Sequence, residues 1–357
     1  MASSSNLSHA ASVPDTGAPA LPPDALFEVL LRLPAKDLCR LRAVCLSWRA
    51  LISDPHFAAE HKSRHTEPLF ALTFRDGDIR GVAIVSLSGQ ILRRIRIASD
   101  RIELLLTHLD RLCDEFVGIC IERRFNWGSA LRHNCKTVTY AFGQVASTGD
   151  YKVLRISHPD RSQSLLCDIN TLDGSSQGRW RRKQNPPSNL TRDQIMECLA
   201  VNGAVYFLFD YAVMEPTSIA PFDLDTEKWM PTLWGPEPLR SAKFGLYSGR
   251  VLSLANLNGS LVIVDNDAGV SFDLWFLVDH KRGLWVKKYR LSMKHLGYLV
   301  YPLLILDDGR IVIFEMVERL LKCYDPTTDN LADVLDIRAM GLAESQSIGV
   351  YTGSLLI

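Results

Sequence analysis

Three glycine-containing turns recur in the second half of this 357-residue chain, and each begins the same series of segments. The turns are the dipeptides Asn202-Gly203, Asn258-Gly259 and Asp308-Gly309. Each dipeptide favours a two-residue hairpin, because its glycine accepts a positive φ. An apolar strand follows, then a connection of variable length, an aromatic strand that ends in Asp, a polar turn and a further strand. Recurrence at intervals of about 50 residues predicts a repeat architecture.

A unit of this kind buries both faces of its sheet only by stacking on its neighbours. The spacing matches kelch-type propeller blades. We therefore predict a mainly β domain, kelch-like or propeller-like, from Leu69 onward. Earlier runs such as LFALTF, before Asp76-Gly77, are also typical of strands, whereas residues 101–113 and 192–199 fit short helices. The alternative is a β-sandwich or an irregular β-domain in which Asn-Gly turns recur by chance.

The stretch from Leu21 to Phe57 has a different, helical pattern. Prolines 22 and 23 suit the first turn of a helix, and apolar residues at positions 26, 29, 30 and 33 form one stripe. After Pro34, apolar residues continue at spacings of three and four until Asp54-Pro55 closes the run. We expect two or three short helices, with a break near residues 45–47, and a helical tail or linker over residues 58–68.

Leu31 and Leu46 lie off the main apolar stripes of this module. A module of this length has little interior in which to bury them. Apolar surface therefore stays exposed after the helices pack together, and we expect a partner protein to cover it. The alternative is a helical cap that packs on the β domain of the same chain.

Composition places limits on the partners and the compartment. Lys and Arg residues equal Asp and Glu residues in number, so bulk charge attracts neither nucleic acid nor anionic membrane. The eight cysteines are scattered without a C-x-x-C pair, which favours reduced thiols in the cytoplasm or nucleus. The first twenty residues lack the features of a signal or transit peptide, and no apolar run reaches the roughly 20 residues that span a bilayer.

Nucleotide-binding and zinc-protease motifs are missing from the sequence. It contains no G-x-x-x-x-G-K-[ST], G-x-G-x-x-G or H-E-x-x-H pattern. His133 and Cys135 have no second ligand pair at a zinc-like spacing. The basic run from Arg179 to Lys183 fits a solvated strand end better than a nucleic-acid site, and Asp223 to Glu227 most simply forms a turn. We therefore expect no catalytic residue, cofactor or metal.

The amino-terminal module resembles a plant F-box. The matching residues are Leu21-Pro22-x-Asp24, then Glu28-Val29-Leu30-x-Arg32-Leu33-Pro34, then Leu38-x-Arg40-x-Arg42-x-Val44-Cys45-x-x-Trp48-Arg49-x-Leu51-Ile52-x-Asp54-Pro55-x-Phe57. The sequence departs from the family pattern at Ala25, where leucine is usual, and at Leu46, where lysine is common.

The resemblance implies a small all-α, three-helix F-box that docks on a Skp-type adaptor, and through it on a cullin scaffold carrying the ubiquitin-transfer machinery. The adaptor would then cover the exposed leucines. The residues expected to bind the adaptor, some of which also serve the internal core, are Leu21, Pro22, Leu26, Leu30, Leu33, Pro34, Leu38, Leu41, Val44, Trp48 and Leu51.

Most of Leu69 to Ile357 resembles the F-box-associated domain of plant F-box proteins. The supporting phrases are Gly149-Asp150-Tyr151-Lys152-Val153, Val201-Asn202-Gly203-x-Val205-Tyr206, Phe222-Asp223-Leu224-x-Thr226-x-x-Trp229 and Leu274-Trp275-x-Leu277-x-Asp279. That resemblance implies that the domain holds a protein target for ubiquitination, without naming it. Long connections are the expected contact sites, because loops vary while strands support them; they are Ser176 to Gln194, Tyr211 to Thr217 and Thr232 to Lys243.

These features predict three regions: a disordered leader over residues 1–17, an F-box and linker over 18–64, and an F-box-associated β domain over 65–357. The expected function is a non-catalytic substrate receptor of a Skp–cullin–F-box ubiquitin ligase. One alternative is an enzyme on a propeller scaffold, such as a carbohydrate-active hydrolase. Another is a scaffold that binds the adaptor and delivers no target for degradation.

Overall fold

The structure of the chain is a computed structural model. It describes residues 22–64, 67–77, 79–97, 138–157, 165–172, 180–186, 195–209, 217–240, 250–267, 270–292, 299–342 and 348–351. The chain divides into two compact units, one of residues 1–66 with 354–357 and one of residues 67–353. The predicted leader and the predicted helix at 101–113 lie outside the described residues.

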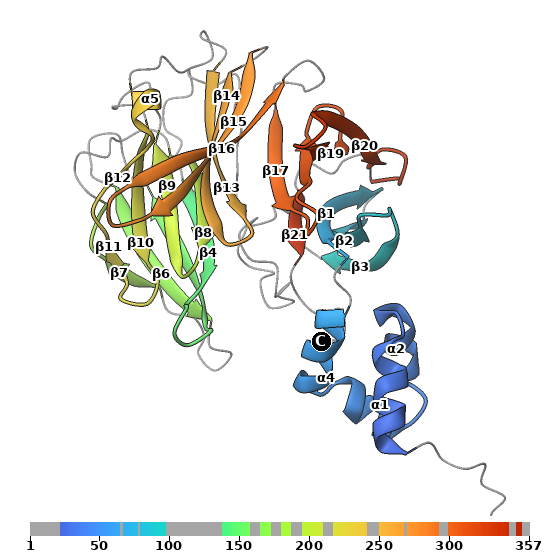
Figure 1. Ribbon diagram of the computed structural model, residues 1–357. Helices are drawn as coiled ribbons and strands as arrows, with labels where there is room; N and C mark the ends of the chain where they lie inside the picture. Colours follow the sequence, from blue (N-terminus) through green and yellow to red (C-terminus); the bar gives the residue numbers. More distant parts are fainter. Residues whose placement is uncertain are drawn as a thin grey trace, which may run out of the picture. The chain divides into compact units, whose positions relative to one another are not determined.

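The first unit contains four helices in its described part (Figure 1). They are α1 (Pro23–Leu31), α2 (Ala35–Leu41), α3 (Leu46–Ile52) and α4 (Pro55–Arg64). The predicted break is confirmed, since α3 begins at Leu46. None of the described helices has the length and apolar character needed to cross a membrane.

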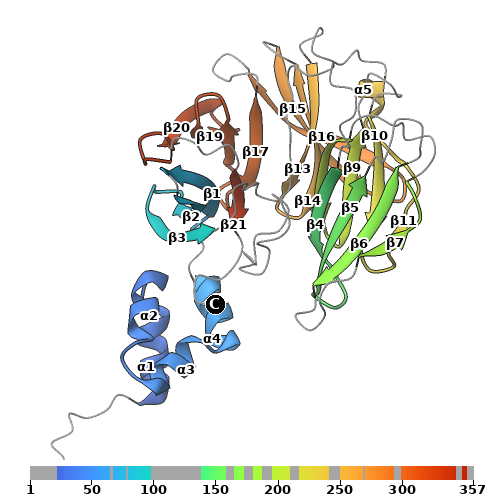
Figure 2. The ribbon, with the colours of Figure 1, turned by 180° about the vertical axis from the view of Figure 1, so that it is seen from behind.

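The second unit is a β-propeller, as predicted, with five antiparallel blades among the described residues (Figures 1 and 2). Blade 1 contains β1 (Leu69–Asp76), β2 (Ile79–Ser86), β3 (Ile91–Ile97) and β21 (Ile348–Tyr351). Blade 2 contains β4 (Val138–Gln144), β5 (Tyr151–Ser157), β6 (Leu166–Leu172) and β7 (Arg181–Lys183).

Blade 3 contains β8 (Ile195–Val201), β9 (Ala204–Phe209), β10 (Ser218–Asp223), β11 (Lys228–Trp229) and β12 (Leu233–Trp234), followed by helix α5 (Glu237–Arg240). Blade 4 contains β13 (Arg250–Leu257), β14 (Ser260–Asp267), β15 (Ser271–Asp279) and β16 (Leu284–Ser292). Blade 5 contains β17 (Val300–Ile305), β18 (Ile311–Glu315), β19 (Leu320–Asp325) and β20 (Asn330–Asp336). The predicted helix at 192–199 is wrong, because residues from Ile195 form β8.

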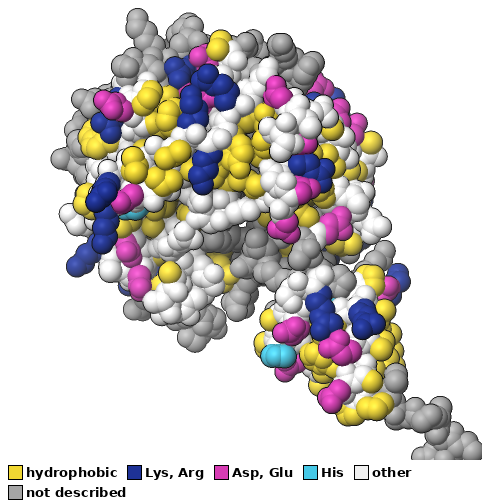
Figure 3. Space-filling view, in the orientation of Figure 1, with side chains coloured by type: hydrophobic (Ala, Val, Ile, Leu, Met, Phe, Trp, Pro, Cys, Tyr) yellow, Lys and Arg dark blue, Asp and Glu magenta, His cyan; other side chains and the backbone are white. Residues whose placement is uncertain are grey.

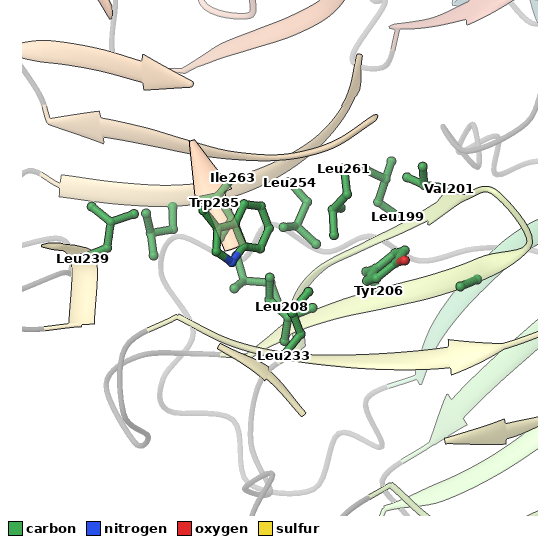
Figure 4. Packing of buried hydrophobic residues seen from close by; sticks show 13 residues of the cluster. Leu199, Val201, Tyr206, Leu208, Leu233, Leu239, Leu254, Leu261, Ile263 and Trp285 are labelled. Carbon is green, nitrogen blue, oxygen red and sulfur yellow. The ribbon is translucent and has the colours of Figure 1, made fainter. Parts of the chain in front are cut away.

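Alternate residues of one strand enter the cores on its two sides, because successive side chains of a strand point to opposite faces. In β9, Val205 and Phe207 pack into the core between blades 2 and 3. Tyr206 and Leu208 pack into the core between blades 3 and 4, which also contains Trp285 (Figure 4). Burial on both faces explains why these strands are continuous apolar runs.

The last described strand completes the first blade. β21 pairs antiparallel with β1, and Leu69 lies opposite Tyr351. Figures 1 and 2 show the two strands side by side. Their apolar side chains, including Phe70 and Ile348, share a core with β18 of blade 5. This pairing joins strands from the two ends of the domain, so it cannot form until nearly the whole domain has been made.

The predicted Asn-Gly hairpins are confirmed at two of the three positions. Asn202 and Gly203 have φ values of 49° and 79°, and Asn258 and Gly259 have 51° and 79°. Both glycines and both asparagines therefore occupy the left-handed region that a type I′ turn requires. Around Gly309 the predicted two-residue turn is wrong, because residues 306–310 separate β17 from β18 and Gly309 alone among them has a positive φ, of 86°.

Candidate functional site

The helical unit has a small core made by all four helices. Its fully buried members are Leu30, Leu31, Leu38, Ile52, Phe57 and Ala58. Two of these six residues come from α4, and His61 Nε2 of the same helix lies 2.8 Å from the Leu33 carbonyl oxygen. The expected helix in the helical tail or linker over residues 58–68 is confirmed as far as Arg64, and α4 in addition forms part of the core.

The start of α4 explains how it joins that core. Asp54 Oδ1 accepts hydrogen bonds from the backbone N–H groups of His56 at 2.8 Å and Phe57 at 3.2 Å. This is the N-cap arrangement, with Pro55 at the first helical position. At the far end of the helix, Arg64 donates two hydrogen bonds to the Glu28 carboxylate, at 2.8 and 3.0 Å. These hydrogen bonds lower the pKa of the Glu28 carboxyl.

The two most exposed large apolar side chains in the described part of the unit lie at or just before the start of α3. Val44 is 62% exposed and Leu46 is 83% exposed, while Val29 of α1 is 48% exposed. The prediction of an exposed Leu46 is confirmed. The same prediction for Leu31 is wrong, because Leu31 lies in the core that α4 completes. Apolar groups of this size on a surface favour contact with a partner.

The residues predicted to bind an adaptor occupy three environments. Leu30 and Leu38 are buried in the unit's own core. Leu26, Leu33, Leu41, Trp48 and Leu51 are partly buried against it. Pro22, Pro34 and Val44 are exposed, and Leu21 lies outside the described residues. Helical spacing identified the apolar positions but not their burial, which depends on how four helices pack.

In the propeller, one face carries the tight turns and both ends of the described domain. A turn joins the first to the second strand of a blade at Asn202-Gly203 and Asn258-Gly259, and another joins the third to the fourth. Because strands alternate in direction, these turns lie at one end of the sheets. Leu69 and Tyr351 lie at the same end. The opposite face therefore carries the other connections.

The predicted aspartate turns are confirmed between third and fourth strands. Asp223 Oδ1 accepts hydrogen bonds from the N–H groups of Asp225 and Thr226, and Asp279 Oδ1 accepts one from Arg282. Asp325 Oδ1 accepts one from Thr327. These are turns closed by an aspartate side chain. The predicted assignment of Asp223 to Glu227 as a turn is thus confirmed.

Polar side chains at these turns also join neighbouring blades. Asn258 Nδ2 donates to the Ile305 carbonyl oxygen at 2.7 Å, and the Ile305 N–H donates to Asn258 Oδ1 at 3.1 Å. Trp285 Nε1 donates to the Trp234 carbonyl oxygen at 2.8 Å. The turn residues therefore have a structural role beyond chain reversal, which the sequence motif alone did not show.

The described cations of the predicted basic run, Arg181, Arg182 and Lys183, form ion pairs within the propeller. Arg182 Nε lies 2.6 Å from Asp168, which is buried and also pairs with Arg155 at 2.9 Å. Arg181 and Lys183 pair with Glu227 of the next blade. Charges paired in this way are not available to a nucleic acid.

Glu227 is contacted by three cationic side chains. Its carboxylate contacts Lys152 at 2.9 Å, Arg181 at 2.7 Å and Lys183, and its side chain is 11% exposed. Burial alone would raise its pKa, but hydrogen bonds from Arg181, Lys183 and Lys152 outweigh burial and lower the pKa to about 2. Glu227 stands in the left-handed region with a φ of 55°, so the turn itself directs its carboxylate.

The expected target-binding connections lie largely outside the described residues. Their described parts are 180–186, 217 and 232–240, while His133 and Cys135 are outside. Within the described ranges, no group of three or more His, Cys, Asp or Glu side chains is placed to hold a metal ion. Five cysteines in those ranges are free thiols, two of them buried.

Comparisons with known proteins identify similarities over both units. Residues 19–59 match the model of the F-box domain, and residues 122–347 match the model of the F-box associated beta propeller domain. An F-box/LRR-repeat protein of Arabidopsis thaliana is 24% identical over 349 residues, covering 87% of this chain and 77% of the relative. An F-box/kelch-repeat protein of the same plant is 26% identical over 323 residues, covering 83% and 85%.

Among solved structures, a selenomethionine-substituted virginiamycin B lyase from Staphylococcus aureus aligns with a TM-score of 0.31 and 11% identity, covering 75% of this chain and 69% of that one. Similarity at this level is too low to transfer a fold or an activity.

Proposed function

Because the chain belongs to the family of F-box proteins with an F-box associated beta propeller domain, we propose that it is the substrate-recognition subunit of a Skp–cullin–F-box ubiquitin ligase. In this proposal the helical unit binds a Skp-type adaptor and the propeller binds a protein target. The family assignment supports such a role at the family level.

The exposure of Val44 and Leu46 is the observation that carries the adaptor-binding proposal. Burying a side chain of this size releases roughly 1.5 to 3 kcal/mol. Leu41, Trp48 and Leu51 are partly exposed beside the same core, and Pro34 is exposed. We assign these residues to the adaptor contact, whereas Leu30 and Leu38 support it from inside the core.

The proposed mechanism is proximity and requires no catalytic group in this chain. Holding a target on a scaffold that also carries a ubiquitin-charged enzyme raises the local concentration of target lysines. The ion pairs of Glu227, which join blades 2 and 3, then have a structural role, which is to hold these blades together while the propeller binds its target. We also propose that the protein works in the cytoplasm or the nucleus, where its free thiols stay reduced; imaging of a fluorescent fusion would test this.

Affinity purification from plant cells tests the proposal. The tagged full chain should capture a Skp-type adaptor and a cullin, identified by mass spectrometry. A variant with Val44→Ser and Leu46→Ser should lose both while it keeps other proteins bound to the propeller, and those proteins should turn over more slowly. An unchanged yield of adaptor with the double variant would contradict the adaptor contact. Unchanged turnover of every captured protein would favour a non-degradative scaffold.

A further inference from the structure

The outer strand of blade 4 offers an open edge. The strand order of that blade is β13-β14-β15-β16, so β16 has β15 as its one strand partner in the described part of the chain. β16 is nine residues long, from Leu284 to Ser292, whereas the outer strands of blades 2 and 3 have three and two residues. An open edge presents unpaired N–H and C=O groups to which another strand can add.

Three exposed apolar side chains lie beside this edge. They are Val278 of β15, 49% exposed, and Leu284 and Val286 of β16, 50% and 42% exposed. Leu284 and Val286 point to the same face because they are two residues apart. Val286 lies opposite Phe276 in the register of the hairpin. Figure 3 shows hydrophobic side chains gathered over this part of the propeller, near Lys and Arg side chains.

The same hairpin is strongly basic. Between Asp279 and Ser292 the sequence has five Lys and Arg residues and one Asp. Lys287 and Arg290 pair with the buried Asp273, at 3.0 and 2.7 Å. Lys281 and Lys288 form no ion pair with any described residue, and Lys288 Nζ lies 4.5 Å from the centre of the Phe276 ring. Unneutralised cations therefore border the apolar side chains.

The other long outer strands lack this combination. β20 has Val334 exposed, but its charged residues are Asp333 and Asp336. β3 has three arginines, but its described apolar side chains, Ile91, Leu92 and Ile95, are only partly exposed. β16 therefore differs from β20 and β3, because it is long, has exposed apolar side chains beside it and is bordered by lysines that form no ion pair with a described residue.

We propose that the edge of β16, with Val278, Leu284, Val286, Lys281 and Lys288, binds an extended acidic segment of the target protein as an added strand. Main-chain hydrogen bonds give such a complex its affinity, and alternate side chains give it specificity. A second copy of this chain is disfavoured, because like charges on two β16 edges would face each other. An acidic segment with alternating apolar residues complements both the lysines and the exposed apolar side chains beside β16. The inference rests on the proposed target-binding function and assigns it a surface.

A pair of labelled peptides tests this inference on the full chain. One peptide has four Val-Glu repeats between glycines, and in the other Lys replaces Glu. Fluorescence anisotropy should show the Glu peptide binding at least about tenfold more tightly than the Lys peptide. Lys288→Glu should weaken binding of the Glu peptide by about fivefold, whereas the matched variant Lys228→Glu on the outer strand of blade 3 should leave it unchanged.

Hydrogen exchange locates the bound peptide. The Glu peptide should slow exchange of the amides of β16 and leave those of β20 unchanged. Equal affinity for the two peptides, equal effects of the two Lys→Glu variants, or protection confined to another strand would overturn the inference. Adaptor binding, measured on the same protein samples, tests the proposed function independently of peptide binding. If the chain binds adaptor normally but the peptide does not slow exchange in β16, the proposed function is retained and only the β16 binding surface is rejected.

Discussion

The helical unit and the propeller differ in how completely they bury their apolar side chains. The helical unit has one small core and leaves exposed Val44, between α2 and α3, and Leu46, the first residue of α3. The propeller buries most apolar residues of its inner strands in cores between successive blades. Because small units bury a smaller share of their surface, the first is suited to completion by a partner. The second is stable through its own repeats.

The largest effect is expected from a cavity in a core between blades. Phe222 is fully buried between blades 2 and 3, and its ring centre lies 5.1 Å from that of Trp229. Phe222→Ala should lower the free energy of unfolding by about 3 to 5 kcal/mol. Urea denaturation of the full chain, followed by tryptophan fluorescence, measures this change. Val334→Ala, on the outer strand of blade 5, is the control and should change it by less than about 0.5 kcal/mol.

Local sequence patterns predicted much of the propeller. The Asn-Gly turns could be predicted because few residue types accept a positive φ. The structure confirms positive φ values at Asn202-Gly203 and Asn258-Gly259. The pairing of Leu69 with Tyr351 could not be predicted, because it joins distant segments and no local pattern encodes it. Leu31 was assigned wrongly for a similar reason: its burial depends on α4, which the helical stripe of α1 does not reveal.

The charge cluster at Glu227 tests whether the blades depend on ionic contacts. Its pKa falls from an ordinary 4.5 to about 2, so the stabilisation is complete above about pH 4.5 and is lost as the pH falls toward 2. The loss should be about 2 to 3 kcal/mol over that range. Glu227→Gln should flatten this part of the stability curve, measured as urea midpoints from pH 6 to pH 2.5. Parallel curves for the variant and the wild-type chain would show that the cluster does not stabilise the fold.

The turn asparagines test a weaker contact between blades. Asn258→Gly keeps the left-handed turn but removes the two hydrogen bonds to Ile305, so it should cost about 1 to 2 kcal/mol. Asn258→Ala adds the strain of a left-handed alanine and should cost about 1 kcal/mol more. Thermal unfolding of both variants separates the two contributions. Identical unfolding temperatures for the two variants would show that a left-handed alanine at position 258 adds no strain.

The smallest effect on stability is expected at Leu46 in the helical unit. Leu46→Ser should change the free energy of unfolding by less than about 0.5 kcal/mol, because the side chain is 83% exposed. Urea denaturation measures this change alongside Phe222→Ala. A loss of more than about 1 kcal/mol would show that Leu46 packs within this chain, and the contrast between the two regions would fail.

Calorimetric titration of the full chain with a purified Skp-type adaptor tests whether the helical unit is completed by a partner. We expect a one-to-one complex for the wild-type chain and an affinity at least about tenfold weaker for the Val44→Ser, Leu46→Ser double variant. The wild-type chain and the double variant should unfold at the same urea concentration. A wild-type chain that binds no adaptor, or a double variant that binds it equally well, would show that Val44 and Leu46 do not form an adaptor contact.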